Sequence, residues 1–184
     1  MGQFFLLRVF FALIACVLAV NASSAITVLS DTIALCNAAS ALNSAELAYP
    51  ATGPGSLTSA INLHTKHNAF IVAINATALD ATNVSPAPIG AADSTSICNT
   101  LSGCASTIQS VFNRYVVLEP AWVNVPVVLN WITLIKVDVH NLTVAVSAFE
   151  TALSTKLDTS AQPCLASFQS TVDPAAASAI VAYN

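Results

Sequence analysis

The segment from Pro126 to Leu157 constrains the fold most strongly, because its apolar residues recur with the period of an α-helix. Spacings of three and four place nine of them on one helical face. They are Val128, Ile132, Ile135, Val139, Leu142, Val146, Phe149, Leu153 and Leu157. Its β-branched residues favour a strand by only a few tenths of a kcal/mol each. The segment therefore predicts one long amphipathic helix.

The first half of this helix is also apolar outside that face, at Val127, Trp131, Leu134 and Val137. A helix that is apolar on more than one face must be surrounded by other helices or by another apolar phase. This surplus of apolar surface is the main functional clue in the sequence.

Four more helices are predicted from the same periodicity and from their capping residues and prolines. They cover about 30–48 with Ile33 facing inward, 56–79, a segment from Asp93 or Ser94 to Pro120, and a segment from Pro163. Pro126 suits the first turn of the long helix, and Pro174 either kinks the last helix or begins a separate one. We expect an all-α, up-and-down bundle of about five helices that has room for an internal apolar cavity.

Residues 1–22 have the pattern of a secretory signal peptide. Arg8 precedes an apolar run from Val9 to Val20, and small residues follow from Ala22 onward. The run is short for a membrane span, and we expect no membrane-spanning segment in the remaining chain. We therefore predict export, with residues 23–184 as a single domain in the cell wall or extracellular space.

Charged residues are only 8% of the chain, against about a quarter in ordinary soluble domains. The net charge of −4 argues against nucleic acid or an anionic membrane as a partner. Hydroxyls, amides and sugars must then solvate the surface. Two acceptor sequences predict N-glycosylation at Asn75 and Asn141, and Asn141 should be the less accessible because it adjoins the apolar stripe.

Four cysteines lie beyond the signal peptide: Cys36, Cys98, Cys104 and Cys164. An even number in an exported chain predicts two disulfides. All four fall in the early turns of the first, third and fifth helices, which should point the same way. A Cys98–Cys104 bond is disfavoured, since six helical residues rise about 9 Å. Cys36 and Cys164 should each take one of the middle pair, unless the third helix begins after Gly103 and leaves a local loop.

The common catalytic and cofactor-binding patterns are absent from the sequence, so we expect no enzyme activity and no cofactor. His64 and His67 are three residues apart, but no carboxylate or Cys lies beside them at helical spacing. They are interpreted as ordinary surface or core-edge histidines, and no metal site is expected. His140 and Asp138 are two residues apart and should face different ways on a helix.

Several segments together resemble the fungal hydrophobic surface-binding protein A family, which includes cell-wall galactomannoproteins. They are Leu63-His64-Thr65, Ala69-Phe70, Ala78-Leu79-Asp80, Asp93-Ser94, Leu118-Glu119-Pro120-Ala121-Trp122 and Ala179-Ile180-Val181-Ala182-Tyr183. The resemblance implies a secreted, non-catalytic five-helix bundle that binds hydrophobic surfaces, with related domains holding fatty acids between helices. The four cysteines depart from the family, whose members often lack them, and would restrain the opening of a cavity.

A fatty acid or other apolar small molecule, or a hydrophobic surface, is therefore the expected partner. The residues expected to line a lipid site are Phe70, Ile74, Ile108, Phe112, Trp131, Leu134, Ile135 and Phe149. Gln109 or His64 would anchor a lipid carboxylate. The alternative is a secreted helical protein inhibitor or interaction protein without a lipid. Plant invertase and pectin methylesterase inhibitors are also four-cysteine bundles, but their close cysteine pair lies near the N-terminus.

Overall fold

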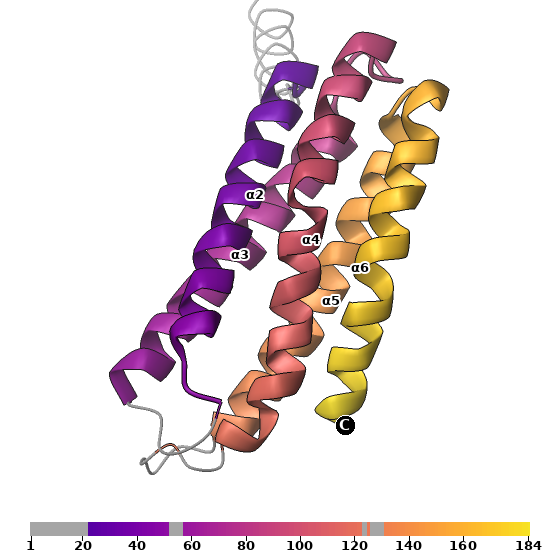
Figure 1. Ribbon diagram of the computed structural model, residues 1–184. Coiled ribbons are helices and arrows are strands. Elements are labelled where there is room, and N and C mark those ends of the chain that lie inside the picture. The colour runs from indigo at the N-terminus through magenta and orange to yellow at the C-terminus, as the bar shows by residue number, and fades with distance from the viewer. Residues whose placement is uncertain (1–21, 52–56, 123–124, 126–130) are drawn as a thin grey trace, which may run out of the picture.

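The computed structural model describes residues 22–51, 57–122, 125 and 131–184 (Figure 1). Its helices are α2 (Ala25–Ala48), α3 (Leu57–Asn83), α4 (Ala91–Trp122), α5 (Trp131–Lys156) and α6 (Gln162–Ala182), with a short 3-10 helix, η1 (Thr159–Ala161), before α6. Within these ranges the β-structure is one isolated bridge between Ser23 and Val84. The predicted all-α bundle is confirmed.

The helices form two layers (Figure 1). Helix α4 packs between α2 and α6, and these three make the first layer. Helices α3 and α5 pack on each other and make the second layer, with α3 also against α2 and α5 against α6. The chain alternates direction, so α2, α4 and α6 run the same way, as the short links predict. The core lies between the layers.

The apolar stripe of the long helix faces this core. Seven of its nine members are buried, from Ile135 to Leu157, and Ile132 is half-buried. The second apolar face is only partly covered, since Trp131 is buried, Leu134 is half-buried and Val137 is 49% exposed. Of the two expected covers for this face, other helices or another apolar phase, helices therefore do not cover Val137. Val127, Val128 and the predicted first turn at Pro126 lie outside the described residues.

Helix α2 begins earlier than predicted and presents a different face. Its N-cap is Ser24, whose hydroxyl accepts a hydrogen bond from the Thr27 N–H at 3.1 Å. The structure buries Thr32, whereas Ile33 is 47% exposed, contrary to our expectation. Burial of Thr32 is possible because its hydroxyl donates to the Val28 carbonyl at 2.7 Å, so no polar atom is left without a partner.

Two prolines expected to end or interrupt helices lie inside them. Helix α4 continues past Pro120 to Trp122, whose indole packs on Tyr49 with ring centroids 4.7 Å apart. Tertiary packing thus holds the last turn although the proline lacks an N–H. Helix α6 likewise continues through Pro174, so no separate terminal helix forms.

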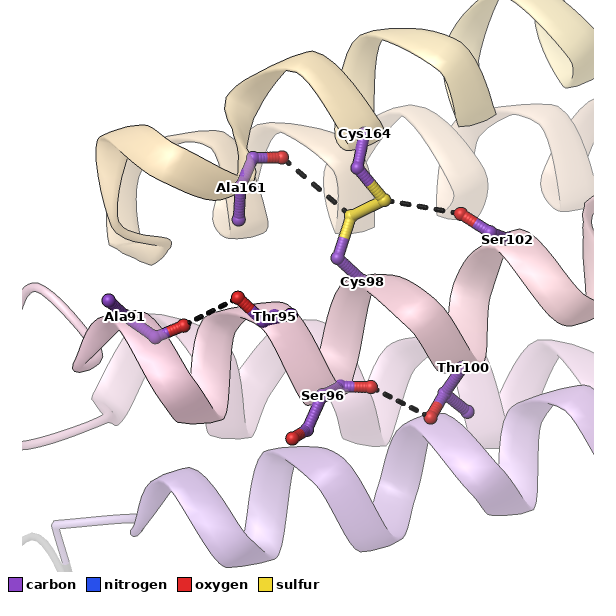
Figure 2. The surroundings of a disulfide bond; sticks show 8 residues. All are labelled: Ala91, Thr95, Ser96, Cys98, Thr100, Ser102, Ala161 and Cys164. Atoms are coloured by element: carbon purple, nitrogen blue, oxygen red, sulfur yellow. Dashed lines mark hydrogen bonds between the residues drawn. A yellow bond between two sulfur atoms is a disulfide. The ribbon is translucent and has the colours of Figure 1, made fainter.

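Two disulfides fasten the first layer together. Cys36 of α2 is bonded to Cys104 of α4, and Cys98 of α4 to Cys164 of α6, with Cα atoms 5.6 and 6.1 Å apart. Figure 2 shows the second bond, with the Ser102 hydroxyl 3.2 Å from the Cys164 sulfur. Each outer cysteine takes one of the middle pair, as predicted. Helices α3 and α5 take part in neither bond.

Helices α2 and α5 are each long and apolar enough to cross a bilayer by length and composition alone. The expectation that no such segment follows residue 22 is therefore not supported. Both helices bury one face in the bundle, and core helices of this kind share the same composition.

Candidate functional site

The residues predicted to line a lipid site lie in the core between the two layers. Those from α3, α4 and α5 join one apolar cluster, in which Leu134 is half-buried and the others are buried. They are Phe70, Ile74, Ile108, Phe112, Trp131, Leu134, Ile135 and Phe149. Phe149 also makes an edge-on contact with Phe168 of α6, with ring centroids 6.3 Å apart. The predicted residues therefore share one apolar environment that crosses both layers.

A polar cluster lies in the same core, towards the end of the bundle opposite the disulfides. His67 of α3 and Tyr115 of α4 share a hydrogen bond of 2.6 Å between Nδ1 and the hydroxyl. Tyr183, which follows α6, donates to the Tyr115 carbonyl at 3.0 Å and accepts from the Trp122 indole at 2.8 Å. This network joins three helices across the two layers, and all four side chains are buried.

A second part of the cluster pairs the two helices of the second layer. His64 Nδ1 lies 2.7 Å from Asp138 Oδ2, and Asp138 Oδ1 lies 3.9 Å from His67 Nε2. His67 is completely buried, so its interpretation as a surface or core-edge residue is wrong, whereas His64 is half-buried and lies at the edge of the core as predicted. Their carboxylate comes from α5, 74 residues away, and periodicity within one helix could not reveal it. Asp138 is buried and His140 exposed, as predicted.

Glu46 of α2 completes the cluster and carries its least satisfied group. The side chain is completely buried, and neither carboxyl oxygen has a hydrogen-bond partner. The Arg114 guanidinium instead donates to the main-chain carbonyls of Glu46 and Tyr49, at 3.0 and 2.8 Å. Burial raises the pKa of the Glu46 carboxyl well above 4.5, although the charge of Arg114 opposes this. The protonated form is therefore favoured.

Burial keeps most of the cluster uncharged. It lowers the pKa of His67 to about 4, helped by the nearby His64, so the imidazole is neutral at pH 7. It raises the pKa of Tyr115 far above its usual value, and the pKa of Asp138 is raised less because His64 stabilises the carboxylate. The cluster is thus a set of mostly neutral donors and acceptors in an apolar core.

Several polar atoms around this cluster are buried without a hydrogen-bond partner, among them His67 Nε2, the Tyr49 hydroxyl and Trp131 Nε1. Buried polar groups normally find partners, so these atoms can bind a polar group of a ligand. Gln109, one of the two anchors predicted for a carboxylate, is half-buried and lies outside the cluster, whereas His64 belongs to it. In the described part of the chain, no group of three potential metal ligands occurs.

Two open grooves lie on the outside of the second layer. One, of about 820 Å³, follows α5 and is lined by small and hydroxyl side chains such as Ser147, Ala148 and Thr151. The other, of about 370 Å³, lies between α3 and α5. Both predicted sugar acceptors, Asn75 and Asn141, line it and are exposed. The predicted lipid-lining residues contribute to neither groove.

No protein-family model matches the chain, and no curated protein matches its sequence. Solved structures do match. AfMP4p in complex with palmitic acid has a TM-score of 0.74 and 22% identity, covering 87% of this chain and 99% of that one. Ligand-binding domain 1 of the Penicillium marneffei MP1 protein, complexed with arachidonic acids, has a TM-score of 0.71 and 16% identity, covering 87% and 99%.

Ligand-binding domain 2 of the same Penicillium marneffei protein, complexed with multiple arachidonic acids, has a TM-score of 0.70 and 12% identity. The match covers 86% of this chain and 95% of that domain. The three structures share the fold of this chain. Their low sequence identities mean that the agreement lies in helix arrangement rather than in particular side chains.

Replacing Glu46 with Gln should stabilise the fold at neutral pH. The carboxyl ionises above pH 4.5 in the unfolded chain but at a higher pH in the core. The Glu46 carboxyl should therefore lower the free energy of unfolding of the wild-type protein by about 1.4 kcal/mol for each pH unit from 4.5 up to its raised pKa. The effect of His67 has the opposite sign but is common to both proteins, so it cancels in their difference.

Urea unfolding of wild-type protein and Glu46→Gln across this pH range measures the difference. Glu119→Gln, which removes a carboxyl at the same end of the bundle from a half-buried position, controls for the loss of charge alone. If the difference in free energy of unfolding between Glu46→Gln and the wild-type protein does not grow with pH, the prediction is contradicted.

Proposed function

We propose that this protein is an exported, non-enzymatic lipid carrier that holds a fatty acid or a similar single-chain lipid between its two helix layers. The observation that carries the proposal is the fold, shared over 86–87% of the chain with three domains whose structures contain palmitic or arachidonic acid. The apolar core between the layers supports it, since α3, α4 and α5 contribute aromatic and aliphatic side chains there. The resemblance to the hydrophobic surface-binding protein A family points the same way.

The binding free energy would come from the acyl chain. Each methylene removed from water contributes about 0.8 kcal/mol, so a chain of a dozen or more carbons offsets the cost of parting the core side chains. Phe70, Ile74 and Phe112 would move aside to make contact with the chain. No covalent chemistry is required of any residue.

The disulfides leave a route for the lipid. Both join helices of the first layer, and all four cysteines after residue 22 are used in them. Helices α3 and α5 are held to the first layer by noncovalent contacts among the described residues. The bundle can therefore open by movement of the second layer away from the first. The disulfides would then restrain movement among the helices of the first layer, but not the opening between the two layers.

Adsorption to a hydrophobic surface is a second candidate, favoured by the outer face of α3. Leu57, Ile61, Val72 and Leu79 recur there with helical spacing and are 36–67% exposed. Such a stripe would lie flat on a waxy surface without any opening of the core. It differs from the internal site in depending on exposed rather than buried residues.

Export is proposed from residues 1–22 together with the disulfides, which persist in oxidising compartments. The cell wall or extracellular space is the destination we propose. Sugars at Asn75 and Asn141 would lie side by side over the groove between α3 and α5, and would solvate a surface with few charges.

The internal site predicts that Ile74→Phe weakens palmitate binding by about tenfold, a loss of about 1.4 kcal/mol, by filling core space. Val72→Phe is the matched control, because Val72 lies on the same helix but is 67% exposed whereas Ile74 is 1% exposed. Isothermal titration of the delipidated proteins measures both affinities, and thermal unfolding verifies that both fold. Equal affinities for the two variants would contradict an internal site, and a loss confined to Val72→Phe would favour the outer face.

Export predicts a mature chain that begins near residue 23 and carries sugars at Asn75 and Asn141. N-terminal sequencing of protein secreted by a eukaryotic host checks the cleavage. Intact mass before and after enzymatic removal of N-glycans, with Asn75→Gln and Asn141→Gln as controls, checks the sugars. A chain retained inside cells with residues 1–22 still attached would contradict the export proposal.

A further inference from the structure

The core of the bundle offers acids but no permanent cation. Its buried polar residues comprise three carboxyls, one imidazole and three hydroxyls: Thr32, Glu46, His67, Thr77, Ser94, Asp138 and Glu150. In the described part of the chain no Lys or Arg is buried. An ionised lipid carboxylate placed in this core would therefore lack a counter-ion, and burying an unpaired charge is costly.

Arg114 is the cation nearest to the polar cluster, but it is half-buried and two of its nitrogens already donate to the main chain. Its Nε and Nη2 atoms donate to the carbonyls of Glu46 and Tyr49, where they satisfy the C-terminal end of α2. Lys136, near the same end of the bundle, is exposed and donates to the Asn184 carbonyl at 3.3 Å. Arg114 and Lys136 therefore donate to main-chain carbonyls, and neither is buried in the core.

The charged and titratable groups that face the cluster come from every helix. They are Glu46 of α2, His64 and His67 of α3, Arg114, Tyr115 and Glu119 of α4, Asp138 of α5 and Tyr183 after α6. Burial is the main cause that raises the pKa of Tyr115, and the carboxyls of Glu46 and Asp138 raise it further when they are ionised. Glu46 is favoured in its protonated form, whereas His64 stabilises the carboxylate of Asp138, so an ionised lipid head would add a second negative charge beside Asp138.

The unsatisfied atoms of the cluster suit an uncharged head. A protonated Glu46 both donates and accepts, and neither of its oxygens has a partner. His67 Nε2 is a free donor if Tyr115 donates to Nδ1, and a free acceptor if Nδ1 carries the proton. A hydroxyl group can pair with either residue in either protonation state, because it also donates and accepts. An ionised carboxylate can only accept.

Building on the lipid-binding function proposed above, we propose that the head of the lipid lies against Glu46, His67 and Tyr115 and is uncharged. The ligand class is a single-chain lipid with a hydroxyl head, such as a fatty alcohol or a monoacylglycerol, in preference to an ionised fatty acid. A fatty acid would bind in its protonated form.

The apolar residues continue from this head position towards the disulfides. On α3, Phe70 and Ile74 follow His67, and on α4, Phe112 and Ile108 precede Tyr115 in the same direction. Tyr115 lies eleven residues from Cys104, which is about 16 Å along the helix. A straight acyl chain of about a dozen carbons spans this length. The polar head would then lie against the polar cluster and the acyl chain against apolar side chains.

Competition for a neutral fluorescent naphthylamine probe tests the proposal, with laurate and dodecanol as ligands of equal chain length at about pH 8. The full disulfide-bonded protein is used after delipidation. Wild-type protein should bind dodecanol at least about tenfold more tightly than laurate. Transfer from water alone favours the alcohol. The deciding measurement is therefore how the ratio of the dodecanol affinity to the laurate affinity changes when the two carboxyls are removed.

The double variant Glu46→Gln/Asp138→Asn removes both carboxyls and should narrow the ratio at least fourfold. Asp93→Asn/Asp173→Asn, which removes two carboxyls from exposed positions, should leave the ratio unchanged. Wild-type preference for laurate, or the same ratio in both double variants, would overturn the uncharged-head proposal while leaving lipid binding in place. Failure of both ligands to displace the probe would overturn lipid binding itself.

Discussion

Burial of apolar side chains between two helix layers is the constraint on which the rest of this structure depends. Each helix contributes a stripe of apolar residues, and the stripe of α5 runs from Ile135 to Leu153, with Leu157 buried just after the helix. The two disulfides stabilise only the first layer. Contact between the layers therefore rests on packing, which a lipid chain of similar chemistry can replace. The same core that holds the fold together is in this way suited to hold a ligand.

The polar cluster is the costly exception within this core. Glu46 has a buried carboxyl without a partner, and His67 is held neutral although its ordinary pKa is near neutrality. Apolar residues of similar size would stabilise the bundle more, since unsatisfied buried polar groups cost about 1–3 kcal/mol each. The proposed recognition of a polar lipid head would account for the presence of these groups in an apolar core.

Helical periodicity predicted the number and order of the helices, because each stripe repeats within one segment. Helix direction and rise predicted that Cys36 and Cys164 would each bond to one of the two middle cysteines, but not to which one. Periodicity failed for Ile33 and Thr32, since a threonine that bonds to its own helix can be buried in place of an isoleucine. It could not find the His64–Asp138 pair or place Glu46 beside Tyr115. Those contacts depend on the register between helices that are about 70 residues apart in the chain. The periodicity within one helix carries no information about that register.

The central claim is that lipid occupies the space between the layers, and native mass spectrometry of the protein secreted from a eukaryotic host tests it most directly. The account predicts a folded protein that carries a single-chain lipid, released by organic extraction and rebound by the delipidated protein. A protein that emerges bare and takes up neither a fatty acid nor a fatty alcohol would contradict it. The buried polar cluster would then be a structural feature of the bundle alone.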